Sequence, residues 1–214
     1  MPKASVSKFF DSYACEFNEI YGDNNTFTHN FINRHFRKCM EIRFGKTIEG
    51  CDPIEGKDVI DIGCGPGQYG VILARKGARF VCGVDFSEGM LDLARQNAER
   101  HGVGDQCRFL REEFLTYEID DRFDYAVVMG FMDYVQPPED VVEKVLSITK
   151  RKAFFSFPAA AGFLAWQRKV RYKKKCDLFM YTQEQVQDLF RDTACRNVEI
   201  EQIDREFFVT AFVE

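Results

Sequence analysis

The chain has 214 residues, a length that favours one domain with additions, and with 45% hydrophobic and 29% charged residues its composition is that of an ordinary globular protein. Its net charge of −5 argues against a nucleic-acid partner, and no run of 18 apolar residues predicts a membrane span. Eight scattered cysteines, without a C-x-x-C pair or a secretion signal, predict reduced thiols, no metal site and a cytoplasmic location.

The first 50 residues predict a helical cap made of two helices. Residues 4–21 combine a helical pattern with several aromatic side chains on a broad apolar face. A second helix is expected from Thr26, which suits an N-cap, to about Phe44, and Gly45 suits the end of that helix. A turn-rich joint then leads into the main body of the chain.

From residue 57 onward, short apolar strands alternate with helices. The expected strands are 57–62, 79–85, 107–110, 123–130 and 152–158, and the expected helices are 68–77, 87–102 and 137–150. A helix at about 182–192 and two strands, 197–203 and 205–213, complete the chain. The alternation predicts a parallel sheet with helices on both faces. Because only a tight turn separates the last two strands, the final strand is expected to be antiparallel.

A glycine-rich loop, VIDIGCGPGQYG at residues 59–70, follows the first of these strands. Gly65, Gly67 and Gly70 have the spacing of the G-x-G-x-x-G dinucleotide fingerprint. Asp85, at the end of the next strand, suits the acid that this fingerprint places on a ribose. Ligands of open α/β sheets bind beyond the carboxyl ends of the strands, where this loop is expected to lie.

The position of Asp61 changes the expected ligand. A carboxylate at the end of the first strand repels a pyrophosphate and attracts a cation. A ligand that carries a ribose, an ammonium and a sulfonium agrees with both acids and with the glycines. S-adenosylmethionine has all three groups, and its own carboxylate can face the helix N-terminus that follows Gly67.

The segments DIGCGPGQYG and VDFSEGM resemble the first two motifs of class I S-adenosylmethionine-dependent methyltransferases. The resemblance covers residues 57–213. It implies a Rossmann-like, doubly wound α/β fold, with a mostly parallel seven-stranded sheet and an antiparallel last strand. The whole chain, 1–214, is then a single methyltransferase domain, with a helical cap or lid at 1–50, a cofactor-binding core at 57–157 and an acceptor-side insertion at 158–182.

The same resemblance assigns residues to the cofactor: Asp61, Gly63, Gly65, Gly67, Asp85, Phe86, Met90, Glu113, Met129, and, from the leading helix, Tyr13 and Tyr21. It implies that the glycines let the backbone approach the methionine part. Asp61 lies near the ammonium and Asp85 accepts both ribose hydroxyls. Phe86 and Met90 pack on the adenine, and Glu113 stands where the family usually has an Asp that bonds the adenine amine. One of the two tyrosines is expected near the methionine end.

The acceptor side offers weaker signals. Asp133 and Tyr134, after the fourth strand, could orient a substrate or take a proton; the alternatives are a helix-capping Asp and a packed Tyr. Residues 168–175, RKVRYKKK, hold six positive charges, and Arg168 and Arg171 could bind an anionic acceptor. The alternative for this run is a solvated connection. MGFMDYV, SFP and residues 168–182 together are similar to the corresponding part of magnesium-protoporphyrin methyltransferases, which methylate a carboxylate.

These observations predict an enzyme that moves a methyl group by in-line displacement to a small or medium-sized, possibly anionic acceptor, with O-methylation favoured. Two other functions stay open: a non-catalytic scaffold that binds the cofactor, and an NAD-dependent oxidoreductase. The second needs a substrate domain for which the chain has too few residues. The oligomeric state stays open.

Overall fold

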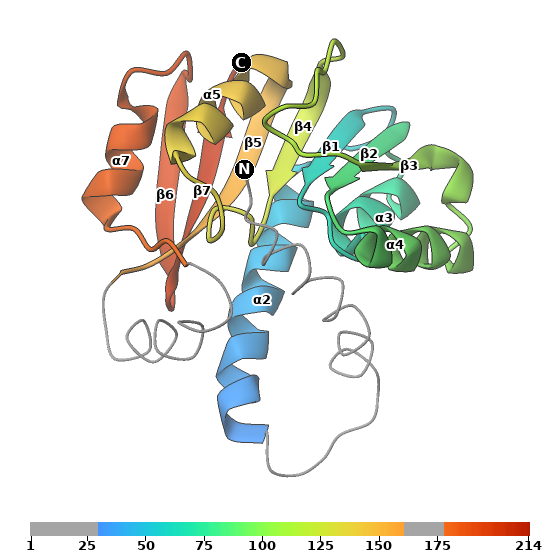
Figure 1. The fold of residues 1–214 in the computed structure, drawn as a ribbon, viewed down its shortest axis with the longest axis horizontal. Helices are drawn as coiled ribbons and strands as arrows, with labels where there is room; N and C mark the ends of the chain where they lie inside the picture. Colours follow the sequence, from blue (N-terminus) through green and yellow to red (C-terminus); the bar gives the residue numbers. More distant parts are fainter. Residues whose placement is uncertain (1–29, 161–177) are drawn as a thin grey trace.

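The computed structural model describes residues 30–160 and 178–214, with side-chain surroundings from residue 38 onward. Its centre is a sheet of seven strands in the order β3-β2-β1-β4-β5-β7-β6 (Figure 1). The strands are β1 (Asp58–Ile62), β2 (Phe80–Asp85), β3 (Cys107–Arg111), β4 (Phe123–Val128), β5 (Thr149–Pro158), β6 (Asn197–Ile203) and β7 (Glu206–Phe212). The helices are α2 (Asn30–Gly50), α3 (Gln68–Arg75), α4 (Glu88–Arg100), α5 (Pro138–Ile148) and α7 (Gln183–Arg191), with a short 3₁₀ turn, η1 (Gly104–Gln106).

The strand directions confirm the predicted fold class. Each neighbouring pair among β1 to β5 is parallel, whereas β7 is antiparallel to both β5 and β6. The last two strands form a hairpin in which Ile203 pairs with Glu206. Its turn contains Asp204 with φ 54°, a left-handed conformation that Asp tolerates better than most residues. The sheet is therefore Rossmann-like and mostly parallel, with its sequence-last strand antiparallel.

Helices cover both faces of the sheet, which explains why the strands have nearly continuous apolar sequences. Buried side chains of α2, α3 and α4 pack with Val59, Val81 and Val127 on one face. Those of α5 and α7 pack with Ile60 and Val128 on the other face. Successive side chains of a strand point to opposite faces, so each strand contributes to both layers of the core.

The end of α2 differs from its prediction. The expected stop at Gly45 is wrong, because the helix continues to Gly50. Its last turns are held in the core, where the fully buried Thr47 hydroxyl donates to the Arg43 carbonyl at 2.9 Å. A Cβ at Gly50 would lie 2.6 Å from the Phe154 ring, so this glycine permits the close approach of α2 to β5. The expected start at Thr26 lies outside the described residues.

Two further boundaries depend on short-range hydrogen bonds. The Ser87 side chain accepts from the Met90 amide, which confirms Ser87 as the N-cap of α4. α5 ends at Ile148, earlier than predicted, and β5 begins directly at Thr149. The Thr149 hydroxyl donates to the Val145 carbonyl at 2.6 Å, which stabilises this abrupt change from helix to strand.

The described segments contain six free thiols, and burial raises the pKa of each. Within residues 30–160 and 178–214, no three His, Cys, Asp or Glu side chains are grouped so that they could hold a metal ion. No helix of these same segments is both long and apolar enough to cross a membrane.

Candidate functional site

The strand order places a crevice between β1 and β4. From β1 the chain proceeds to β2 and β3 on one side, and it then returns to β4 and β5 on the other side of β1 (Figure 1). Such a topological switch point leaves a crevice at the carboxyl ends of the strands, where doubly wound folds bind ligands. The glycine-rich loop follows β1 directly and therefore lies at this edge of the sheet.

The glycine loop is shaped by three residues that need a left-handed backbone. Gly63, Gly65 and Gly67 have φ values of 66°, 51° and 74°, a region that side chains disfavour. A Cβ at Gly63 would lie 2.6 Å from the Phe131 ring, so the loop packs closely against the segment after β4. A Cβ at Gly65 would meet no described atom within 4 Å. Among the described residues, Gly65 therefore has open space beside its Cα.

Asp85 at the end of β2 is held against the same loop. Its carboxylate accepts from the Gly65 amide and from the Ser87 amide, each at 2.9 Å. The side chain is buried, with 9% of the residue exposed. A carboxylate has about four lone-pair positions, so bonds to both amides are compatible with further bonds from hydroxyls. The structure thus brings Asp85 and Gly65 together, as the spacing of the motif predicted.

Asp61 is a buried carboxylate without a neighbouring cation among the described residues. It is 2% exposed, and one oxygen, Oδ2, accepts from the Gly70 amide at 3.2 Å. Burial raises the pKa of Asp61 to about 7; the Gly70 bond opposes the shift and the charge of Asp85 adds to it. Within the described segments Oδ1 accepts no hydrogen bond, yet it is not fully enclosed. A cation bound beside Asp61 would therefore favour its ionised form.

The other residues assigned to the cofactor also lie at or near the carboxyl ends of the strands. Phe86, directly after β2, is half-buried, and Met90 on α4 is buried. Glu113 is half-buried and begins the turn after β3. Met129 follows β4 and is 7% exposed.

Four residues that the sequence assigned to the site, Tyr13, Tyr21, Arg168 and Arg171, lie outside the described residues. The other predicted site residues lie at or near the carboxyl ends of β1 to β4. The assignments of these four remain predictions.

Asp133 and Tyr134 lie in the segment between β4 and α5. Asp133 is buried, and its carbonyl accepts from the Phe179 amide at 2.9 Å. The residue at the N-cap of α5 is Pro137, so the alternative in which Asp133 caps this helix is wrong. Burial, followed by the charge of Asp133, raises the pKa of Tyr181. Asp133 thus contacts the segment that follows residue 177, whereas Tyr134 is half-buried.

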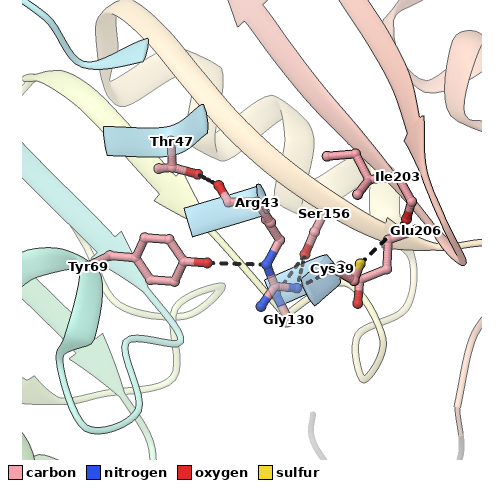
Figure 2. Close-up of polar contacts among 8 residues, drawn as sticks. All are labelled: Cys39, Arg43, Thr47, Tyr69, Gly130, Ser156, Ile203 and Glu206. Atoms are coloured by element: carbon pink, nitrogen blue, oxygen red, sulfur yellow. Dashed lines mark hydrogen bonds and ion pairs between the residues drawn. The ribbon is translucent and has the colours of Figure 1, made fainter. Parts of the chain in front are cut away.

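A buried arginine that sequence analysis missed connects four elements at this edge of the sheet (Figure 2). Arg43 of α2 donates through Nε to the Tyr69 hydroxyl at 3.1 Å. Its Nη1 donates to Glu206 Oε2 at 2.8 Å and to Ser156 Oγ at 3.4 Å. Ser156 Oγ also accepts from the Gly130 amide at 2.8 Å. Arg43 therefore lies across the β1–β4 switch point, between the start of α3 and the ends of β4 and β5.

The remaining guanidinium nitrogen of Arg43 is available to a ligand. Within the described segments Nη2 makes no hydrogen bond, and it is not fully enclosed. Burial opposes the charge of Arg43, but Glu206 and the Tyr69 hydroxyl outweigh it and raise the pKa of the guanidinium. A Cβ at the nearby Gly130 would meet no described atom within 4 Å. The crevice thus holds a buried cation on its β4–β5 side and two buried acids on its β1–β2 side.

Comparison with known proteins finds similarity to methyltransferases. Residues 59–152 match a family described as the methyltransferase domain. This part of the chain is therefore similar to a methyltransferase domain, and the fold of the chain is like that of solved methyltransferases.

Individual relatives point the same way. The ubiquinone biosynthesis O-methyltransferase of Coxiella burnetii is 36% identical over 115 residues, which are 52% of this chain and 47% of that protein. The protein of the same name from Neisseria meningitidis is 35% identical over 104 residues, covering 48% and 44%. The matching part thus spans about half the length of these curated relatives. Magnesium protoporphyrin IX methyltransferase from Synechocystis, solved with bound SAH, has a TM-score of 0.79 at 20% identity, with both chains covered completely.

Proposed function

We propose that the protein is an S-adenosylmethionine-dependent methyltransferase that transfers a methyl group to an oxygen atom of a small or medium-sized acceptor. The observation that carries this proposal is the open space at Gly65, whose amide donates to the buried Asp85 in the loop that follows the buried Asp61. A dinucleotide would bring its pyrophosphate to this loop, where an ionised Asp61 repels it. A cofactor with one ammonium and one ribose instead matches both acids.

The residues of the crevice fit the parts of this cofactor. Asp85 would accept the ribose hydroxyls while its bonds to Gly65 and Ser87 hold the loop. Asp61 would face the ammonium, which supplies the cation that this buried carboxylate lacks among the described residues. Arg43 Nη2 is the donor suited to the cofactor carboxylate.

Glu113, Phe86 and Met90 are assigned to the adenine end by the motif that they follow, and Met129 to the cofactor side of the segment after β4. S-adenosylmethionine, when bound, supplies a methyl group on a sulfonium sulfur, which is a good leaving group for displacement.

The acceptor would approach from the side of β4 and β5. The space at Gly130 is open, and Tyr134 and Asp133 follow it directly along the chain. In-line displacement requires that the enzyme hold the acceptor oxygen about 3 Å from the methyl group and exclude water. A carboxylate acceptor needs no base at neutral pH, whereas a hydroxyl acceptor needs a residue that takes its proton, the role proposed for Tyr134 or Asp133.

The type of acceptor and the residues that would contact or cover it are proposed as follows. The names of the curated relatives support O-methylation. Arg168 and Arg171 are the proposed contacts for an anionic acceptor, and residues 4–21, with Tyr13 and Tyr21, are the proposed lid.

A methyl-transfer assay tests the proposal. The protein is incubated with S-adenosylmethionine labelled in the methyl group and with a panel of phenols, catechols and carboxylic acids, and labelled product and S-adenosylhomocysteine are measured together. The proposal predicts equal amounts of both products for at least one acceptor. Binding of S-adenosylhomocysteine without transfer to any acceptor supports a scaffold, and binding of NAD instead supports an oxidoreductase.

A further inference from the structure

We propose that Glu206 is a positioning residue, which sets the guanidinium of Arg43 so that its free nitrogen receives the carboxylate of the cofactor. The inference rests on the proposed function. It explains why a residue at the start of the last strand, 163 positions from Arg43 in the chain, contacts the site at all. Under this proposal Glu206 controls how strongly the site distinguishes ligands with an amino-acid end from ligands without one.

The hydrogen bonds of Arg43 fix the plane and the rotation of its guanidinium. A guanidinium is planar and has five N–H donors in a fixed fork. Nε bonds to Tyr69, and Nη1 bonds to Glu206 and Ser156, so three contacts from three elements hold the guanidinium on both sides of Nη2 (Figure 2). The two donors of Nη2 then have one possible direction, because the plane cannot turn without breaking these contacts.

Glu206 is well suited to this task because its backbone is fixed from both sides. It is the first residue of β7 and pairs in register with Pro158 of β5 and with Ile203 of β6. Its carboxylate contacts Arg43 through Nη1 alone, which leaves Nη2 for another acceptor. The side chains of the pair are 10% and 12% exposed. A partner that used both terminal nitrogens would form the usual fork-to-fork pair and would close the site to a ligand carboxylate.

Tyr69 links the same guanidinium to the glycine loop. It lies in the first turn of α3, two residues after Gly67, and its ring packs on Phe44 of α2 at 5.0 Å between centroids. The burial of the Tyr69 hydroxyl raises its pKa, so it stays a neutral acceptor for Nε. Tyr69 thus fixes the position of Nη2 relative to the loop that would hold the rest of the cofactor.

Calorimetry with two ligands separates positioning from a general loss of structure. S-adenosylhomocysteine carries the amino-acid end, and 5′-methylthioadenosine carries the nucleoside and the sulfur without it. The quantity of interest is the ratio of two dissociation constants, that of 5′-methylthioadenosine divided by that of S-adenosylhomocysteine. Glu206→Ala should lower this ratio about tenfold or more, because the released guanidinium no longer meets the carboxylate, and it should leave 5′-methylthioadenosine affinity within about twofold. Glu206→Gln keeps an oxygen at the same place and should hold the ratio within about threefold of the wild type.

Glu201→Ala is the matched control. Glu201 also joins the C-terminal hairpin to α2, through Lys46 at 2.7 Å, but that pair is exposed and does not touch Arg43. It should leave both affinities unchanged. If Glu206→Ala does not fold, Tyr69→Phe replaces it, since this variant keeps the ring and removes only the acceptor of Nε; it should lower the ratio about threefold.

Two results would overturn the inference. One is a ratio that Glu206→Ala or its substitute leaves unchanged. The other is an equal loss of affinity for both ligands, which would mean that the contact only stabilises the fold. Wild-type protein that binds neither ligand would refute the proposed function itself. Wild-type binding with an unaltered ratio in the variants refutes only the role of Glu206.

Discussion

The two sides of the crevice are built from contacts of very different range. On the β1–β2 side, Gly65 and Asp85 are 20 residues apart, and Asp61 contacts Gly70 nine residues further on. On the β4–β5–β7 side, Arg43 reaches Ser156 and Glu206 over 113 and 163 residues. The first side is a local motif within one strand–loop–helix–strand unit. The second side exists only when α2, the sheet and the C-terminal hairpin are assembled.

The difference also concerns chemistry. The β1–β2 side presents glycine backbone and two carboxylates, and we expect it to decide whether the cofactor binds at all. The β4–β5–β7 side presents side chains held by other side chains, and we expect it to decide which ligand is preferred. Changes on the first side should therefore weaken or abolish binding of the cofactor, and changes on the second should alter the preference between ligands.

The largest effect is expected at Gly65. Gly65→Val should abolish binding of S-adenosylhomocysteine while the protein stays folded, because a branched side chain would fill the open space there and strain a backbone with φ 51°. Gly56→Val is the matched control: Gly56 also has a positive φ, 72°, and open space at its Cβ, but it lies before β1, away from the crevice. Calorimetry and circular dichroism measure both variants. Normal binding by Gly65→Val would remove the loop from the site.

Asp61 should show a large, pH-dependent effect on stability. Its pKa is raised from 3.8 to about 7, so between these values the folded state keeps a proton that the unfolded state has lost. The free energy of unfolding therefore falls as the pH rises through this window. Above about pH 7 the folded protein is destabilised by the full cost of burying an ionised Asp61. Asp61→Asn, which keeps an acceptor for Gly70, should be more stable than the wild type above pH 7, by up to about 4 kcal/mol at about 1.4 kcal/mol per pKa unit.

The Asp61 difference should vanish as the pH approaches 4. Denaturant titrations across this range measure it, and a pH-independent difference would contradict the account. The wild type should also release protons when it binds S-adenosylhomocysteine near pH 7, since the ammonium of the ligand favours the ionised carboxylate. Asp61→Asn should release none, which calorimetry in buffers of different ionisation enthalpy detects.

Asp85→Ala should weaken S-adenosylhomocysteine by about 2–4 kcal/mol, because two ribose hydroxyls lose a charged acceptor. It should weaken binding of 5′-methylthioadenosine by the same amount, since both ligands contain the ribose. Equal losses would separate Asp85 from Glu206, whose variants should affect only the ligand with the amino-acid end. Asp92→Ala, at an exposed position of α4, serves as the control. Unchanged affinity in Asp85→Ala would show that the ribose lies elsewhere.

The smallest effect is expected for the basic run. Arg168→Ala and Arg171→Ala should each raise KM for an anionic acceptor by about tenfold and leave cofactor affinity intact, because they are proposed to contact the acceptor alone. Steady-state kinetics, with calorimetry for the cofactor, checks both values. If KM is the same as in the wild type, the run is a solvated connection.

The same contrast of range explains what could be predicted from the sequence. The parallel sheet and the antiparallel last strand follow from local patterns, as do the glycine loop and Asp85. Arg43 carries no such signal, since a basic residue on an amphipathic helix is ordinarily solvated and its partners lie far away in the chain. The sequence predicts that α2 ends at Gly45, the first glycine. The observed end at Gly50 could not be predicted, because the contact between Gly50 and Phe154 depends on the assembled sheet.

Titration of the wild-type protein with S-adenosylhomocysteine, 5′-methylthioadenosine and NAD tests the central claim most directly. The account predicts saturable binding of S-adenosylhomocysteine at one site per chain, weaker binding of 5′-methylthioadenosine, and no binding of NAD. Absence of heat with S-adenosylhomocysteine, or binding of NAD in its place, would contradict it.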